Sequence, residues 1–563
     1  MKTLKYIIAA FACVFAFASC SLDETNYMEI EKSKYMKNAT EAQTILLGVY
    51  ENLTKDQMYG FYLSIYFTLG TDQADVEGSG LGSWRAMASN VFSPTESYVK
   101  ETWQALYNAI YDANDFIERL ALAVENFETV EQKNLAAIYM AEARTLRAQF
   151  YFELVRWWGN VVLMKTTKDS SLHPSLYRQS SPQEVYEFIE QDLLYAISIL
   201  PYASEDPYRA DNSYRISKGA ALGLLTKVYA TWAGYPVKDE SKWEKAASTA
   251  KILVESGKHG LLDNFEQLWK NTCNNIWDSK ESLMEVSFYA PVSTGNDPVG
   301  RIGKWNGTTA QDGSGAYIKV PANWKVLPSF IAGWKNSEND LRWGISFADY
   351  QYNKVGESKG EKVNLVSGET FRDAMAKAAG SRSNKYNNGL TPAKWDINKY
   401  VDTKVNTHFP DANFSTVNWY YLRYADVLLL YAEALNEMLK APNAEAYAAV
   451  NMVRRRAFGK PIGVADKDCD LATGLSYEAF KKAVQDERSY ELCFEGHRRQ
   501  DLVRWGIYYE TIMQTASDLA QWHSDAPSVY AIAEYTVKGK HEIMPIPQRD
   551  LDLMTGCKQN PNW

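Results

Sequence analysis

A long helical repeat constrains the fold of this chain more than any other feature of its sequence. In NLAAIYMAEARTLRAQFYFELVRWWG, residues 134–159, the side chains of one predicted face recur at spacings of 4, 4, 3, 4, 4 and 3. Such spacings place side chains on one face of an α-helix. We therefore predict a long helix buried along one side. Its buried positions would be Leu135, Tyr139, Ala143, Leu146, Phe150, Leu154 and Trp157.

The same pattern recurs along much of the chain. RYADVLLLYAEALNEM, residues 423–438, carries apolar positions at spacings of 4, 3, 4 and 3. Strand-like runs are few and short, for example SLMEVSFY at 282–289. The chain is therefore predicted to be mainly α-helical. Further helices are expected around residues 41–54, 101–127, 183–200, 216–233, 241–256, 443–457 and 476–505.

One short phrase occurs twice, as ELVRWWG at 153–159 and DLVRWG at 501–506. In both places a helix is expected to end in an aromatic residue followed by a glycine, which readily adopts the left-handed conformation of a helix C-cap. No regular period of about 34 residues links the two, so a strict repeat array is not indicated. Helix hairpins packed side by side fit the pattern better.

Long insertions rich in glycine, asparagine and aromatic residues interrupt the helices at 57–98, 257–325 and 350–418. Residues 291–317 contain six glycines and show no helical period. Loops of this length in a compact protein are usually functional or disordered. The Trp and Tyr residues within them favour a functional role.

The N-terminus has the features of an export signal. Lys2 and Lys5 precede an apolar run from Tyr6 to Ala18, too short to span a bilayer, and Cys20 follows. This junction resembles a bacterial lipobox, although Phe17 stands where the pattern prefers Leu. We expect a signal peptide over 1–19, a lipidated N-terminus and tether over 20–40, and a single binding domain over 41–563. An ordinary secretory signal with an incidental cysteine is the alternative.

Charge and cysteine spacing exclude several classes of function. The formal net charge is −9, with no basic excess to attract nucleic acid. The spacing of the cysteines after Cys20 matches neither a zinc site nor a small disulfide framework. We expect these four to be mostly buried thiols, with room for one disulfide. They are Cys273, Cys469, Cys493 and Cys557.

Three carboxylates invite a catalytic interpretation. Glu487, Glu491 and Glu495 lie at i, i+4 and i+8, close enough for the carboxyl pair of a glycosidase. Nearby arginines lower carboxyl pKa values and would remove the general acid. We therefore predict an ion-paired structural corner and no enzymatic activity. The local arginines are Arg488, Arg498, Arg499 and Arg504. The histidines form no zinc motif, and neither a metal nor a cofactor is predicted.

Several motifs, in order along the chain, resemble the SusD/RagB family. The resemblance implies an α-helical fold in which tetratricopeptide-like helix hairpins form a scaffold and irregular loops form the ligand surface. It also implies a surface lipoprotein of the outer membrane that captures nutrients, chiefly glycans, for a SusC-like TonB-dependent transporter. The motifs are AEARTLRAQFYFELVRWWGNVVL (141–163), RYADVLLLYAEALNE (423–437), NMVRRRAFG (451–459), ERSYELCFEGHRRQDLVRWG (487–506) and IMPIPQRDLDLMTGCKQNPNW (543–563).

Loop aromatics are the candidate ligand-binding residues. A ring offers apolar area to a sugar face while polar neighbours bond its hydroxyls. By analogy with the family, the matching positions are Trp84 with Arg85, Tyr289, Trp305 with Asn306, and Tyr317; Trp277 and Asp72 are further candidates.

Other functions of these loops stay open. They could contact the transporter instead of a ligand, and the cargo could be a peptide, as the RagB branch of the family suggests. A hydrolase with an unrecognised active site is a weaker alternative. The sequence does not distinguish one glycan from another.

Overall fold

The structure is a computed structural model that describes residues 36–76, 81–208, 214–288, 298–311, 317–336, 338–352, 362–364, 390–401, 413–520 and 530–563. The predicted signal peptide, the predicted lipidation site Cys20 and the candidate Tyr289 lie outside these residues. In the described part of the chain, no helix is both long and apolar enough to cross a membrane.

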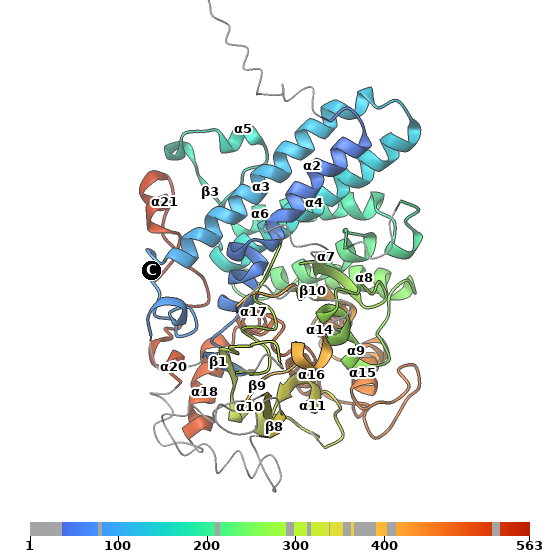
Figure 1. The fold of residues 1–563 in the computed structure, drawn as a ribbon, viewed down its shortest axis with the longest axis vertical. Coiled ribbons are helices and arrows are strands. Elements are labelled where there is room, and N and C mark those ends of the chain that lie inside the picture. The colour runs from blue at the N-terminus through green and yellow to red at the C-terminus, as the bar shows by residue number, and fades with distance from the viewer. Residues whose placement is uncertain are drawn as a thin grey trace, which may run out of the picture.

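Long helices form two connected groups (Figure 1). In the first group α4 packs against α2, α3 and α6, and α7 packs against α8; in the second, α14 packs against α15 and α16. Contacts of α14 with α7 and α8 join the groups. The first group comprises α2 (Ala39–Glu51), α3 (Ser97–Ala123), α4 (Val130–Trp158), α6 (Pro182–Ile199), α7 (Lys218–Ala233) and α8 (Lys242–Glu255). The second comprises α14 (Tyr424–Leu439), α15 (Ala444–Ala457), α16 (Tyr477–Glu491), α17 (Arg498–Arg504) and α18 (Tyr508–Ala520).

These helices confirm the mainly α-helical prediction, and their ends follow local sequence signals. Thr129 caps α4 by accepting a hydrogen bond from the backbone of Gln132, and Ser181 and Glu184 form a capping box at the start of α6. The predicted glycine caps are present, since Gly159 and Gly506 have φ angles of 69° and 70°.

The predicted helix over 476–505 is two helices. Residues 492–497 separate α16 from α17, and within them Phe494 and Gly496 have φ angles of 65° and 83°. A left-handed conformation cannot continue an α-helix, so the chain turns here. Apolar residues at helical spacing lie on both sides of this break, so the sequence predicted one continuous helix.

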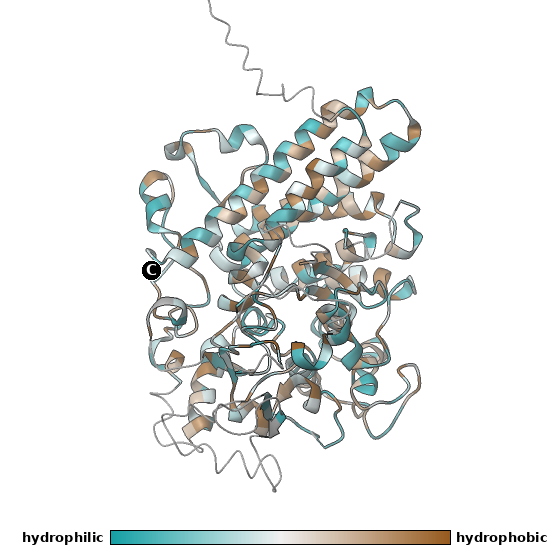
Figure 2. Cartoon of the chain, in the orientation of Figure 1, coloured by the Kyte–Doolittle hydropathy of each residue, from teal (hydrophilic) through white to brown (hydrophobic). Residues whose placement is uncertain are grey.

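The second half of α4 is more buried than its one-sided pattern predicts. Tyr139, Leu146 and Phe150 are buried as expected, but so are Ala148 and Phe152 on the opposite face. Hydrophobic and hydrophilic positions alternate along the neighbouring α2 and α3 (Figure 2). The helix is surrounded because α2, α3 and α6 all pack on it.

Short elements fill the predicted insertions. The 57–98 insertion carries the π-helical turns η3 (Asp56–Gly60) and η4 (Tyr62–Tyr66) and the 3-10 turn η5 (Ser83–Arg85). The 257–325 insertion carries α9 (Phe265–Cys273), a helix that the sequence did not indicate. The remaining short helices are α5 (Thr167–Ser170), α10 (Pro328–Gly333), α11 (Trp343–Ser346), α13 (Ile397–Tyr400), α20 (Ile532–Tyr535) and α21 (Gln548–Leu553).

Strands in the described residues form two-stranded antiparallel ribbons. The predicted run at 282–289 gives β4, in which Val286 lies opposite Trp419 of β10. The ribbons are β1 (Ala74–Val76) with β5 (Trp324–Val326), β4 (Ser282–Val286) with β10 (Trp419–Arg423), β2 (Val161–Val162) with β3 (Gln179–Ser180), β6 (Phe347–Ala348) with β9 (Thr391–Pro392), and β7 (Tyr350–Tyr352) with β8 (Lys362–Asn364).

Glu487 and Glu491 of α16 and Glu495 of the turn after it lie in a buried ion-pair cluster. We call this cluster the charged corner. Glu491 pairs with Arg342, Arg423 and Arg456 at 3.0, 2.5 and 2.6 Å. Burial raises the pKa of Glu491, but the charges of these arginines outweigh it and lower the pKa to about 2.

The structural prediction for these glutamates is confirmed, although the cations that meet Glu491 come from distant segments and not from the neighbouring arginines. Of those neighbours, Arg488 pairs instead with Asp426 and Asp501. The charged corner comprises Glu281, Asp340, Arg342, Lys394, Arg423, Arg456, Glu487, Glu491 and Glu495.

All four cysteines after Cys20 are free thiols. Cys273, Cys469 and Cys493 are buried, and Cys557 is partly buried. Burial raises the pKa of Cys273 and of Cys493, so both remain protonated at neutral pH. The structure therefore contains the predicted buried thiols and no disulfide among them.

Candidate functional site

A cleft lined by aromatic residues brings together two of the predicted ligand-binding residues, Trp84 and Trp305. Its volume is about 510 Å³, within the usual range for small-molecule sites. We call it the aromatic cleft. Its described lining residues are Asp56, Phe61, Tyr62, Tyr66, Trp84, Tyr98, Arg301, Trp305, Pro321, Asn323 and Asn413.

Trp305 is the centre of the aromatic group. Its ring centroid lies 4.5 Å from that of Phe61, 5.0 Å from that of Trp84 and 5.9 Å from that of Tyr66, each pair edge to face. Such contacts stabilise rings in fixed orientations. Trp305 is only 8% exposed, whereas Trp84 is partly exposed, and the Arg85 guanidinium lies 4.0 Å from the Trp84 ring centroid. The cleft is therefore held rigidly at its base.

Backbone hydrogen bonds position the segment that carries Trp305. The amide of Arg301 donates to the carbonyl of Gly60 at 2.9 Å, and the amide of Trp324 donates to the carbonyl of Trp305 at 3.1 Å. Gly303 has a φ of 74°, and a Cβ there would lie 2.8 Å from Ile397, so a larger residue would displace this turn.

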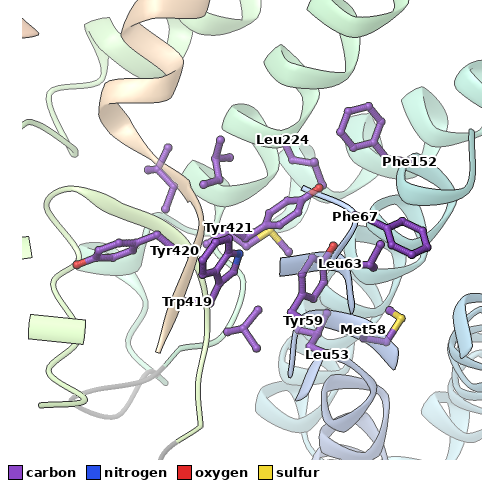
Figure 3. Close-up of a cluster of buried hydrophobic side chains, with 14 of the residues drawn as sticks. Leu53, Met58, Tyr59, Leu63, Phe67, Phe152, Leu224, Trp419, Tyr420 and Tyr421 are labelled. Carbon is purple, nitrogen blue, oxygen red and sulfur yellow. The ribbon is translucent and has the colours of Figure 1, made fainter. Parts of the chain in front are cut away.

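The π-helical turns η3 and η4, which flank Phe61 and carry Tyr62 and Tyr66, are anchored on the core. Figure 3 shows residues of η3 and η4, among them Tyr59 and Leu63, beside Phe152 of α4, Leu224 of α7 and the aromatics of β10. The Tyr59 hydroxyl donates to Glu153 at 2.7 Å. An irregular loop thus presents its aromatic side chains from a fixed base.

The cleft contains one compensated pair of charges. Arg301 Nη2 lies 3.1 Å from Asp56 Oδ2, and the guanidinium lies 4.3 Å and 4.5 Å from the ring centroids of Phe61 and Phe414. Arg301 Nε and Trp305 Nε1 are buried with no hydrogen-bond partner among the described residues. Buried donors are normally paired, so these two are suited to receive oxygen atoms of a ligand.

Two tyrosines of the cleft, Tyr62 and Tyr66, have raised pKa values. Burial raises the pKa of Tyr62, as does its hydrogen bond to Glu101 at 2.9 Å. Burial also raises the pKa of Tyr66, with a further contribution from its hydrogen bond with Tyr98. These phenols therefore keep their protons over the physiological pH range.

The structure places the other predicted residues elsewhere. Asn306 is buried, and its Oδ1 accepts a hydrogen bond from the amide of Gly303 at 2.8 Å, which shapes the turn before Trp305. Tyr317 packs on Tyr352 with ring centroids 4.8 Å apart. Neither residue is among the described residues that line the cleft.

Two further candidates lie in other surroundings. Trp277 lies beside Tyr214, with ring centroids 6.4 Å apart. Asp72 pairs with Arg498 at 2.6 Å and borders a different cavity.

Several residues that line the cleft were not predicted from the sequence. Phe61, Tyr62, Tyr66 and Tyr98 line it, as does Arg301. The stretch QMYGFYLSIYF, residues 57–67, concentrates aromatic residues at the start of a predicted insertion, and that density was the available signal.

The described lining of the cleft offers aromatic rings and hydrogen-bonding side chains. A glycosidase needs two carboxyl groups, and Asp56 is the only carboxylate among the described lining residues. Elsewhere in the described chain, no group of three or more His, Cys, Asp or Glu residues could hold a metal ion.

Comparison with known proteins identifies the family. A family model described as the SusD family matches residues 328–563, and one described as starch-binding associating with outer membrane matches residues 22–230. A solved SusD homologue from Bacteroides thetaiotaomicron is 56% identical, with a TM-score of 0.88 over 95% of this chain and 99% of that one. The chain belongs to the SusD family, which confirms the resemblance seen in its motifs.

More distant relatives align along nearly the whole chain. SusD-like protein P25 of Formosa agariphila is 26% identical over 577 residues, which cover 98% of this chain and 97% of the relative. A solved laminarin-binding SusD-like protein is 25% identical, with a TM-score of 0.65 over 94% of this chain and 100% of that one. The fold is therefore shared over 94% of this chain.

Proposed function

We propose that this protein captures glycans in the aromatic cleft without cleaving them. The observation that carries the proposal is the meeting of Trp84 and Trp305 in one cleft, beside the unpartnered donors Arg301 Nε and Trp305 Nε1. Family membership supports the ligand class, since one family model is described as starch-binding and one solved relative as laminarin-binding.

Capture would use two kinds of contact. The rings of Trp84, Tyr62 and Tyr98 offer apolar area to the C–H face of a sugar. Asn323, Asn413 and the two buried donors would bond sugar oxygens. Neither contact requires a shifted carboxyl pKa, and the single lining carboxylate, Asp56, already pairs with Arg301. Binding alone is therefore the chemistry that these residues support.

The wider setting rests on the family. We propose that Cys20 carries lipid, that the protein lies at the outer surface of the outer membrane, and that it passes its ligand to a SusC-like TonB-dependent transporter. The model over residues 22–230, described as associating with outer membrane, supports this location.

The test is retention of the purified protein on a panel of immobilised polysaccharides and peptides. We expect selective retention by a glycan, and at least a tenfold weaker affinity for Trp84→Ala, which corresponds to about 1.4 kcal/mol. Trp305→Ala should lose binding too, but its burial requires a parallel thermal unfolding measurement.

Trp277→Ala is the matched control because Trp277 is partly buried and lies outside the described lining of the cleft. It should bind as the wild type does. Retention by peptides alone would replace the glycan with a peptide cargo, and release of labelled sugar products would contradict a non-catalytic role.

A further inference from the structure

A second cavity, which the proposed function does not use, lies around Arg498. Its volume is about 550 Å³, comparable to that of the aromatic cleft. Its walls come from α10, α16 and α18, and Arg498 is the first residue of α17. We call it the Arg498 pocket. A cavity of this size is large enough for a small-molecule ligand.

The Arg498 pocket is separate from the aromatic cleft. The described linings of the two share no residue. Asn323 lines the aromatic cleft, whereas the next residue, Trp324 of β5, borders a small cavity beside Arg498. Successive residues of an extended chain point to opposite faces. The chain that leads into β5 thus borders the aromatic cleft at Asn323 and the small cavity at Trp324.

Arg498 is held in a fixed orientation. Its Nε donates to Asp72 Oδ1 at 2.8 Å and its Nη2 donates to Asp72 Oδ2 at 2.6 Å, a bidentate pair. The third nitrogen, Nη1, is buried and has no hydrogen-bond partner in the described part of the chain. The ion pair thus fixes the direction of a donor that no described residue satisfies.

A second unpartnered group borders the same pocket. The Ser329 hydroxyl, at the start of α10, is buried and also lacks a partner among the described residues. Buried polar groups are nearly always paired, so two such groups on one pocket indicate a site for ligand oxygens. The small cavity that Arg498 also borders measures about 10 Å³ and has room for at most about one water molecule. The larger pocket, which Arg498 also lines, has room for a larger ligand.

The charges of the pocket indicate a neutral ligand. Besides the Asp72–Arg498 pair, Asp486 pairs with Lys335 and Lys482, and Glu510 pairs with Lys538. The described lining holds four carboxylates and two cations, which disfavours an anion. Its remaining polar groups include two amides and the hydroxyl of Thr511, and its apolar surface comes from aromatic rings. The amides belong to Gln485 and Gln514, and the rings to Phe330, Tyr490 and Trp505.

We propose that the Arg498 pocket is a second site for a neutral oligosaccharide. The position of this site follows from the unpartnered donors, whereas its ligand class rests on the proposed function. Two sites that share no described lining residue would let a single polysaccharide chain, or two of them, be held at once.

The test is isothermal titration of the purified protein with oligosaccharides from laminarin and from starch. We expect two sites in the wild type. Ser329→Ala should weaken one of them by about tenfold without lowering the thermal midpoint, because it removes a hydroxyl that has no described partner. Thr511→Trp should fill the pocket and abolish that site. Ser517→Trp, on the same helix but outside the described lining, is the matched control.

The outcomes separate the two proposals. A single site that is lost in Trp84→Ala and unchanged in Thr511→Trp would overturn the second site and leave the proposed function intact. A single site lost in Thr511→Trp and kept in Trp84→Ala would support the second site and contradict the aromatic cleft. No binding of either oligosaccharide, together with no retention on any polysaccharide of the panel, would overturn both; retention on another polysaccharide moves the same titration to its oligosaccharides.

Discussion

The charged corner and the aromatic cleft both bring charged and polar side chains together. The two regions differ in how completely these groups are paired. In the charged corner Arg423 pairs with Glu281, Glu491 and Glu495, and all four side chains are fully buried. In the aromatic cleft the ion pair is partly exposed, and two donors have no described partner. Carboxylates that meet several buried cations hold a fold together, and Arg456 Nε in the same corner, which has no partner among the described residues, borders neither of the two large cavities. Unpartnered donors of residues that line a cavity are the ones placed near a ligand.

Breaking the charged corner should have the largest effect. Arg423→Met leaves Glu491 and Glu495 buried with fewer cations, and removing one partner of a buried pair costs about 3–5 kcal/mol. We expect a large fall in the free energy of unfolding, measured by urea denaturation followed by tryptophan fluorescence. Lys251→Met is the control, because it breaks an exposed pair with Glu445 and should change the midpoint little. Equal midpoints for the two variants would contradict the structural role.

A buried glutamate outside the corner should make stability depend on pH in the opposite way to Glu491. Burial raises the pKa of Glu285 to about 8, although Asn418 and Ser282 donate hydrogen bonds to it. The folded protein therefore keeps a proton that the unfolded chain releases near pH 4.5. Its contribution to stability is complete below that pH and is lost as the pH rises through about 8.

Across that window the free energy of unfolding should fall by up to about 1.4 kcal/mol per pH unit from this residue. Glu285→Gln should remove that slope while keeping an oxygen to accept a hydrogen bond. Urea unfolding at several pH values would measure it. An unchanged slope in the variant would assign the pH dependence to other groups.

The smallest expected effect concerns the charge balance of the aromatic cleft. Asp56→Asn leaves Arg301 without its carboxylate, so the cleft gains a net positive charge. An oligosaccharide containing uronic acid should then bind about fivefold more tightly, since two charges about 4 Å apart in water interact by about 1 kcal/mol. Titration at low and high salt would check this, because the gain should shrink as salt increases. A gain that salt does not alter would point to a steric cause.

The sequence predicted the helical scaffold well because its signal is periodic. The face of α4 and the glycine caps at Gly159 and Gly506 follow from spacing and local conformation, and these expectations are confirmed. The break between α16 and α17 was missed because Phe494 takes a left-handed conformation that its residue type does not favour.

The candidate site was predicted only in part, and the reason is physical. Trp84 and Trp305 were identified as loop aromatics, but Phe61 and Tyr66, which contact Trp305, come from between and within two π-helical turns with no recognisable period. Which aromatics meet depends on long-range contacts such as that of Arg301 with Gly60. Such contacts cannot be read from local spacing.

The pairing of Asp72 with Arg498 has a consequence for how the protein is made. The two residues are separated by 426 positions, and Gln73 likewise bonds Ser489 across 416. During synthesis Asp72 remains unpaired until Arg498 has been added, when most of the polypeptide is already made. Contacts between such distant residues slow folding and prolong the exposure of unfinished surfaces. A chain that stopped before α17 would carry Asp72 without its cation, so final assembly depends on the last segment to be made.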